Sequence, residues 1–147
     1  MKTLHHLKKN RGFTLIELMI SVCIMAIAFA GLATMQIACI NGNSIASNLT
    51  TGITLAQDKM EELNSLDYND PALADINTGN SSTLDSYSNY DYREEDIDPQ
   101  GEAGGVYTRI CNVADDTPIP GRKTIVVIVT WQGHRVRVSS IIGAPHS

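Results

Sequence analysis

An apolar run that contains a single carboxylate constrains this chain more than any other feature. The run extends from Phe13 to Ile40, and Glu17 is its one charged residue. This length is sufficient to span a lipid bilayer, which takes about 20 apolar residues. A charge at membrane depth costs about 2.5–3.5 kcal/mol, so Glu17 is expected to have a function and a partner.

A basic segment precedes the run and leads up to Gly12. Its charged residues are all bases: Lys2, Lys8, Lys9 and Arg11. Such a segment stays on the cytoplasmic side of the membrane, so we expect the rest of the chain to emerge on the other side. If the chain is cut after Gly12, Phe13 becomes a free amino terminus four residues before Glu17. The new ammonium group is then available to pair with Glu17 of a neighbouring subunit.

The sequence Gly-Phe-Thr-Leu-Ile-Glu, residues 12–17, resembles the leader motif of the type IV prepilin family without a departure. The resemblance implies cleavage between Gly12 and Phe13 and N-methylation of Phe13. Both steps are attributed in the family to a membrane prepilin peptidase, which is also the methyltransferase. The resemblance also implies assembly with other pilin subunits into a helical filament, in which Phe13 and Glu17 of neighbouring subunits meet.

Two other targeting interpretations fit less well. A secretory signal has an apolar core of about 7–15 residues, which is much shorter than this run. A lipoprotein site would use Cys39, but Gln36 stands where such sites have Leu. An ordinary membrane anchor with an unrelated Glu is the remaining alternative.

The chain after Asn43 changes from uniformly apolar to amphipathic. One helical stripe follows steps of three and four residues: Ile45, Leu49, Ile53, Ala56, Met60 and Leu63. This spacing is typical of an amphipathic helix. We therefore predict a single helix over residues 13–66, with a hydrophobic transmembrane or filament-core part over residues 13–43. Gly31 and Gly42 are expected either to weaken the helix or to permit close helix contacts.

The C-terminal part has the pattern of β-strands. Apolar and β-branched residues dominate Gly105–Val113, Lys123–Trp131 and His134–Ile142, and Gln132-Gly133 is a two-residue hairpin turn. The turn predicts three cross-strand pairs: Trp131 with His134, Val129 with Val136, and Val127 with Val138. Alternation then predicts one apolar face made of Ile125, Val127, Val129, Trp131, Val136 and Val138. We expect this face to cover the helical stripe, with Arg135, Arg137, Ser139, Val126, Ile128 and Thr130 on the opposite face.

These elements predict an α+β fold of the type IV pilin kind, in which a small antiparallel sheet packs on the C-terminal half of a long N-terminal helix. The resemblance implies that residues 1–12 are a cytoplasmic leader that is removed, and we expect residues 44–147 to form a globular head. The head comprises the end of the helix (44–66), an acidic and irregular loop region (67–105) and the sheet (105–142). A short helix is expected near Pro71–Ile76.

Composition argues against several functions. The chain has 11 basic and 16 acidic residues, and removal of the leader leaves 7 basic residues and a net charge of −9. Nucleic-acid binding, which requires clustered Lys and Arg, is therefore not expected. No nucleophile–base pair or zinc spacing stands out, so we predict neither an enzyme nor a cofactor. Acidic residues near Pro99 are weak candidates for calcium ligands: Glu94, Asp96 and Asp98.

The three cysteines do not form a disulfide framework. Cys23 and Cys39 lie about 24 Å apart on one helix and cannot bridge each other, so they are predicted to be apolar fillers. Cys111 has no evident partner in the sequence.

The favoured function is a PilV-type minor pilin that is built into, or primes, a type IV pilus. Residues 55–63 also resemble a segment shared by PilV-type minor pilins and minor pseudopilins of type II secretion. A minor pseudopilin is therefore the alternative, and a membrane-anchored adhesin or ligand-binding head is less favoured. The precursor is expected in the bacterial inner membrane as a single-pass protein with a cytoplasmic N-terminus, and the assembled subunit in a pilus, at the cell surface or in the periplasm.

Overall fold

The computed structural model describes residues 12–77 and 84–144. The elements follow in the order α1 (Leu15–Asn64), η1 (Pro71–Leu73), β1 (Tyr92–Ile97), β2 (Tyr107–Asp115), β3 (Arg122–Trp131) and β4 (His134–Gly143). The chain divides into two compact units, residues 1–44 and residues 45–147, and α1 contributes to both. Except for Gly12, the predicted leader lies outside the described residues.

Helix α1 matches the predicted helix to within two residues at each end. Its residues before Asn48 are all exposed in the single chain. Among the residues that the structure describes, α1 is the one helix that is long and apolar enough to cross a membrane. A free helix with this much exposed apolar surface requires lipid or other helices around it, because apolar surface in water is unfavourable.

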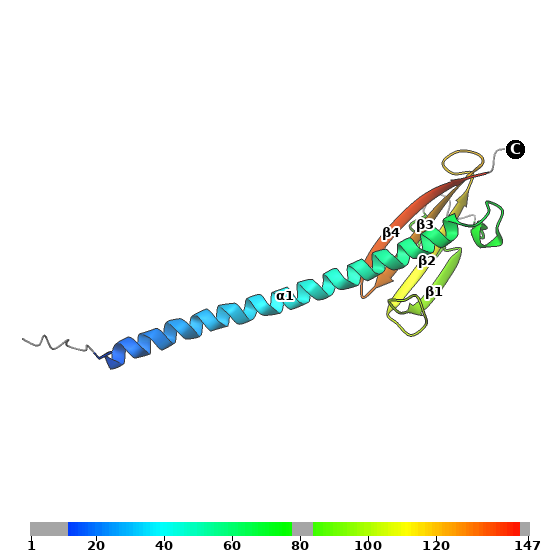
Figure 1. Cartoon of the computed structure of the whole chain (residues 1–147). Helices are drawn as coiled ribbons and strands as arrows, with labels where there is room; N and C mark the ends of the chain where they lie inside the picture. Colours follow the sequence, from blue (N-terminus) through cyan, green and yellow to red (C-terminus); the bar gives the residue numbers. More distant parts are fainter. Residues whose placement is uncertain (1–11, 78–83, 145–147) are drawn as a thin grey trace, which may run out of the picture. The chain divides into compact units, whose positions relative to one another are not determined.

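The sheet is an antiparallel meander with the strand order β1-β2-β3-β4 (Figure 1). Trp131 pairs with His134, and the two further predicted pairs of the β3–β4 hairpin are also present, so the predicted register is confirmed. Gln132 has φ 44° and Gly133 has φ 81°. Positive φ at both central residues defines the tight turn that matches the twist of two antiparallel strands.

One face of the sheet packs on the C-terminal part of α1, which lies along the strands in Figure 1. The predicted apolar face is confirmed, because its four β3 residues are buried in this core and its two β4 residues pack against it. All buried residues of the core lie within residues 45–147. The head therefore has a complete hydrophobic core of its own, which is the condition for independent folding.

The predicted helical stripe was wrong in its first half. The buried positions of α1 are Gly52, Leu55, Ala56, Met60 and Leu63. Ile45 and Leu49 precede Gly52, which lies against Trp131 beside the β3–β4 turn, and both are exposed. Ile53 is 36% exposed, because successive steps of four residues move it away from the face that carries Leu55.

The opposite face of the sheet is also covered. Ile110, Val126 and Ile128 are buried there, and Leu84 and Tyr90 pack against them. The Asn112 side-chain amide donates to the carbonyl oxygens of Leu84, at 2.6 Å, and Ser86, at 3.1 Å. The segment 84–90 is therefore a structural layer of the head.

Two expectations for the region 67–105 have different outcomes. The short helix near Pro71 is present as η1, which Asp70 caps by accepting a hydrogen bond from the Ala72 amide at 2.8 Å. The interpretation of the whole region as irregular loop was wrong, because it contains β1 and the sheet begins at Tyr92. Residues 93–96 of this strand are all charged, which is unusual in a central strand but tolerated at a sheet edge.

Gly52 permits the close approach of α1 to the sheet. A Cβ added at Gly52 would lie 2.6 Å from Cζ3 of Trp131. In an exposed helix, Gly→Ala stabilises by about 1 kcal/mol, but overpacking a core costs about 1–3 kcal/mol. We expect Gly52→Ala to destabilise the head by about 1–2 kcal/mol in urea unfolding. The exposed control Ser47→Ala should leave the free energy of unfolding nearly unchanged, and a stabilised Gly52→Ala head would contradict the contact.

Cys111 is a free thiol in the core, where burial raises its pKa from 9.0 to about 11. The folded state therefore prefers the protonated thiol. Its stabilising contribution is complete below pH 9 and is lost as the pH rises towards 11. We expect wild type to lose about 2 kcal/mol more than Cys111→Ala between pH 9 and pH 11, measured by urea unfolding at both pH values. Equal losses in the two proteins would contradict a buried, neutral thiol.

Candidate processing and assembly site

The chain enters α1 through a capping arrangement. Residues 12–14 are not helical, and α1 begins at Leu15. Thr14 Oγ1 accepts a hydrogen bond from the backbone N–H of Glu17 at 3.3 Å, and the Thr14 carbonyl oxygen accepts from the N–H of Leu18 at 3.1 Å. The sequence Thr-Leu-Ile-Glu is a capping-box pattern, which explains why the helix starts here.

The peptide bond between Gly12 and Phe13 lies outside the helix and is accessible. Phe13 is 85% exposed, and no heavy atom lies within 4 Å of the position that a Cβ of Gly12 would take. A peptidase must reach the bond that it cleaves, and both residues beside this bond are non-helical and exposed. The structure thus places the two predicted processing residues next to each other at the free end of the described chain.

Glu17 lies in the first turn of α1 and is exposed. The positive end of the helix dipole stabilises a carboxylate at this position. Within residues 12–77 and 84–144, no cation forms an ion pair with Glu17. A carboxylate on a strongly apolar helix without a cation of its own requires one from elsewhere when it enters hydrocarbon.

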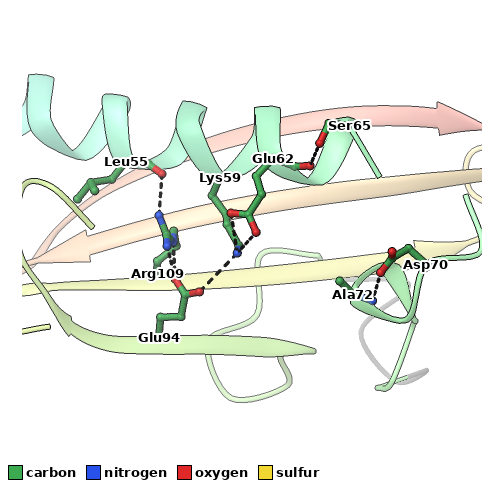
Figure 2. Close-up of polar contacts among 8 residues, drawn as sticks. All are labelled: Leu55, Lys59, Glu62, Ser65, Asp70, Ala72, Glu94 and Arg109. Atoms are coloured by element: carbon green, nitrogen blue, oxygen red, sulfur yellow. Dashed lines mark hydrogen bonds and ion pairs between the residues drawn. The ribbon is translucent and has the colours of Figure 1, made fainter. Parts of the chain in front are cut away.

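The acidic residues of β1 have structural partners in the head. Glu94 forms an ion pair with Arg109 of β2, whose Nε donates to Glu94 at 2.6 Å, and Lys59 of α1 lies 3.5 Å from the same carboxylate (Figure 2). Lys59 also pairs with Glu62 at 2.9 Å, and Arg109 donates to the Leu55 carbonyl oxygen at 3.3 Å. This polar cluster connects α1 to the first two strands.

The calcium candidates are therefore engaged in different ways. Glu94 belongs to the polar cluster, and Asp98 accepts hydrogen bonds from the amides of Gln100 and Glu102, both at 2.9 Å. For Asp96 the contact involves the backbone and not the carboxylate: its carbonyl oxygen accepts hydrogen bonds from the N–H groups of Gly104 and Gly105. In the part of the chain that the structure describes, no group of three or more His, Cys, Asp or Glu residues is arranged to hold a metal ion.

The polar cleft that the sheet forms near its β3–β4 turn was not predicted from the sequence. Tyr87, Thr108, Thr130 and Arg135 line it. The predicted hairpin register already placed Thr130 and Arg135 on the same face of the sheet, and this was the one sequence signal for the cleft. Tyr87 and Thr108 reach the site only through contacts between distant segments.

Comparison with known proteins identifies one feature. A family model described as the prokaryotic N-terminal methylation motif matches residues 7–33. Searches of curated proteins and of solved structures gave no match. The matched motif is the type IV pilin-like leader, and it supports a type IV pilin-like subunit of a pilus or pseudopilus. Subunits of this kind are structural proteins, processed by a prepilin peptidase and assembled with other pilins.

Proposed function

We propose that this chain is a minor pilin of the PilV type, which a prepilin peptidase cleaves after Gly12 and methylates at Phe13. The observation that carries the proposal is the Gly-Phe-Thr-Leu-Ile-Glu motif at the accessible start of an apolar helix with a lone carboxylate. The folded head on the same helix agrees with a subunit that displays a small domain. Other pilin subunits, the inner membrane and the peptidase are its partners.

Pairing of Phe13 with Glu17 gives the assembly step its physical basis. Cleavage removes the bases of the leader together with it. The new α-amine of Phe13 is then the cation that lies nearest to Glu17 in the sequence. Pairing between neighbouring subunits satisfies a carboxylate that is costly in hydrocarbon. The pairing also fixes the axial offset between the helices of neighbouring subunits at four residues, which is about 6 Å at 1.5 Å per residue.

Mass spectrometry of the chain purified from bacterial membranes tests the processing. We expect a polypeptide that starts at Phe13 and carries one added methyl group on its amine. In cells without the peptidase, the intact leader should remain. A chain that starts at Met1 in cells with an active peptidase would overturn the proposal and leave a membrane-tethered head.

A minor pseudopilin of type II secretion is the second candidate. The segment from Leu55 to Leu63 resembles both classes, so the sequence separates them poorly. Purification of pili from cells that express a tagged chain distinguishes a minor pilin from a minor pseudopilin. A minor pilin should copurify with pili, whereas a pseudopilin should copurify with the secretion complex and be required for export.

A further inference from the structure

A cleft of about 430 Å³ lies beside the β3–β4 turn. Three of its lining residues, Thr108, Thr130 and Arg135, belong to the face of the sheet that points away from α1, and residues 131–134 of the turn also line it. Thr130 is two residues from Ile128, which is buried under the segment 84–90, whereas the alternate residues Val129 and Trp131 pack in the core with α1. The cleft therefore opens where the cover provided by residues 84–90 ends.

Three polar side chains stand in a row across this cleft. Thr108 pairs with Thr130 across β2 and β3, and Thr130 pairs with Arg135 across β3 and β4. Directly paired residues of neighbouring strands project from the same face, about 5 Å apart. Tyr87 forms a wall, and its hydroxyl oxygen accepts a hydrogen bond from Arg135 Nη1 at 3.2 Å.

Among the described residues, Arg135 forms no ion pair of its own, and the nearby carboxylate of Asp85, whose charge also acts on Arg135, is paired with Arg137. The ion pairs of the described residues engage Lys59, Arg93, Arg109, Lys123 and Arg137, and none engages Arg135. A guanidinium has five N–H donors in a planar fork, and Tyr87 uses one of them. The remaining donors are available to a ligand in a head that is otherwise strongly acidic.

We propose that this cleft binds a sugar that carries a carboxylate, such as a uronic acid unit of a polysaccharide. The two threonine hydroxyls donate to and accept from sugar hydroxyls, and Arg135 binds the carboxylate with two parallel hydrogen bonds. The face of the Tyr87 ring receives the C–H groups of the sugar ring. A purely apolar ligand would leave the hydroxyls and the guanidinium unpaired. This proposal does not depend on the assignment as a minor pilin.

NMR titration of the isolated head, residues 45–147, tests the cleft, because the complete core lies within this segment. The probes are an oligogalacturonate and the matching neutral oligogalactoside. We expect the amide signals of Thr108, Thr130 and Arg135 to shift when millimolar oligogalacturonate is added. The neutral oligogalactoside at the same concentration should leave them unchanged. Absence of these shifts would overturn the site, and equal binding of the neutral sugar would overturn the ligand class.

Two variants and a matched control sharpen the test. Arg135→Gln should weaken binding about ten- to hundredfold, because a hydrogen bond to a charged group contributes strongly. Thr130→Val, which keeps the shape, should weaken it about fivefold. Arg122→Gln removes another exposed arginine without an acidic partner among the described residues, at the far end of the same hairpin. It should bind as wild type, and an equal loss in this control would show attraction by charge alone and overturn the proposal.

Discussion

Glu17→Ala is expected to leave cleavage between Gly12 and Phe13 intact and to abolish incorporation into filaments. The cleaved bond lies before the helix, whereas Glu17 acts after cleavage by accepting the new amine of a neighbour. Alanine removes the acceptor, so the amine of the neighbouring subunit would enter hydrocarbon unpaired. The cost of an unpaired charge there is about 2.5–3.5 kcal/mol per subunit, or roughly a hundredfold in each association step.

Immunoblots of membranes and of sheared filaments measure the two steps separately. The matched control is Glu17→Asp, which keeps the charge on a shorter side chain and should retain part of the incorporation. Glu17→Val should behave as Glu17→Ala or worse. Incorporation of Glu17→Ala at the wild-type level would contradict the pairing, and failure of its cleavage would assign Glu17 to peptidase recognition instead.

The parts of the fold that depend on neighbouring residues were predictable. The start of α1 follows from the capping pattern from Thr14 to Glu17, and its continuity follows from the absence of proline between them and Asn64. The register of the β3–β4 hairpin follows from a two-residue turn whose Gly133 tolerates positive φ. Each of these features is fixed by contacts over a few residues.

The parts that depend on distant residues were not predictable. Strand β1 is charged throughout its middle, and it pairs because Arg109 and Lys59 neutralise Glu94 from other elements. The buried helical positions begin at Gly52 because of Trp131, which follows it by 79 residues in the chain. The cleft likewise joins Tyr87 to residues that only the folded sheet brings near. The periodicity of the sequence carries no information about these contacts between distant residues.

Asp91 is the clearest of these long-range features. The residue is 9% exposed. One carboxylate oxygen accepts hydrogen bonds from the amides of Ile76, at 2.9 Å, and Asn77, at 2.7 Å, and the other accepts from the amide of Val113 at 2.7 Å. Asp91 thus connects the segment after η1 to β2. Its carboxylate is the hydrogen-bond acceptor for backbone N–H groups that water reaches poorly.

Asp91→Ala is therefore expected to destabilise the head by about 3–5 kcal/mol, because several backbone N–H groups lose a charged acceptor at once. Urea unfolding of residues 45–147 measures the change. Asp98→Ala is the matched control, since Asp98 also accepts two backbone hydrogen bonds but lies in a partly exposed turn that water can enter. The control should cost only about 1 kcal/mol. Similar losses for the two variants would show that burial of the Asp91 carboxylate does not determine its contribution, and a loss for Asp91→Ala below that of the control would remove it as the anchor of the segment after η1.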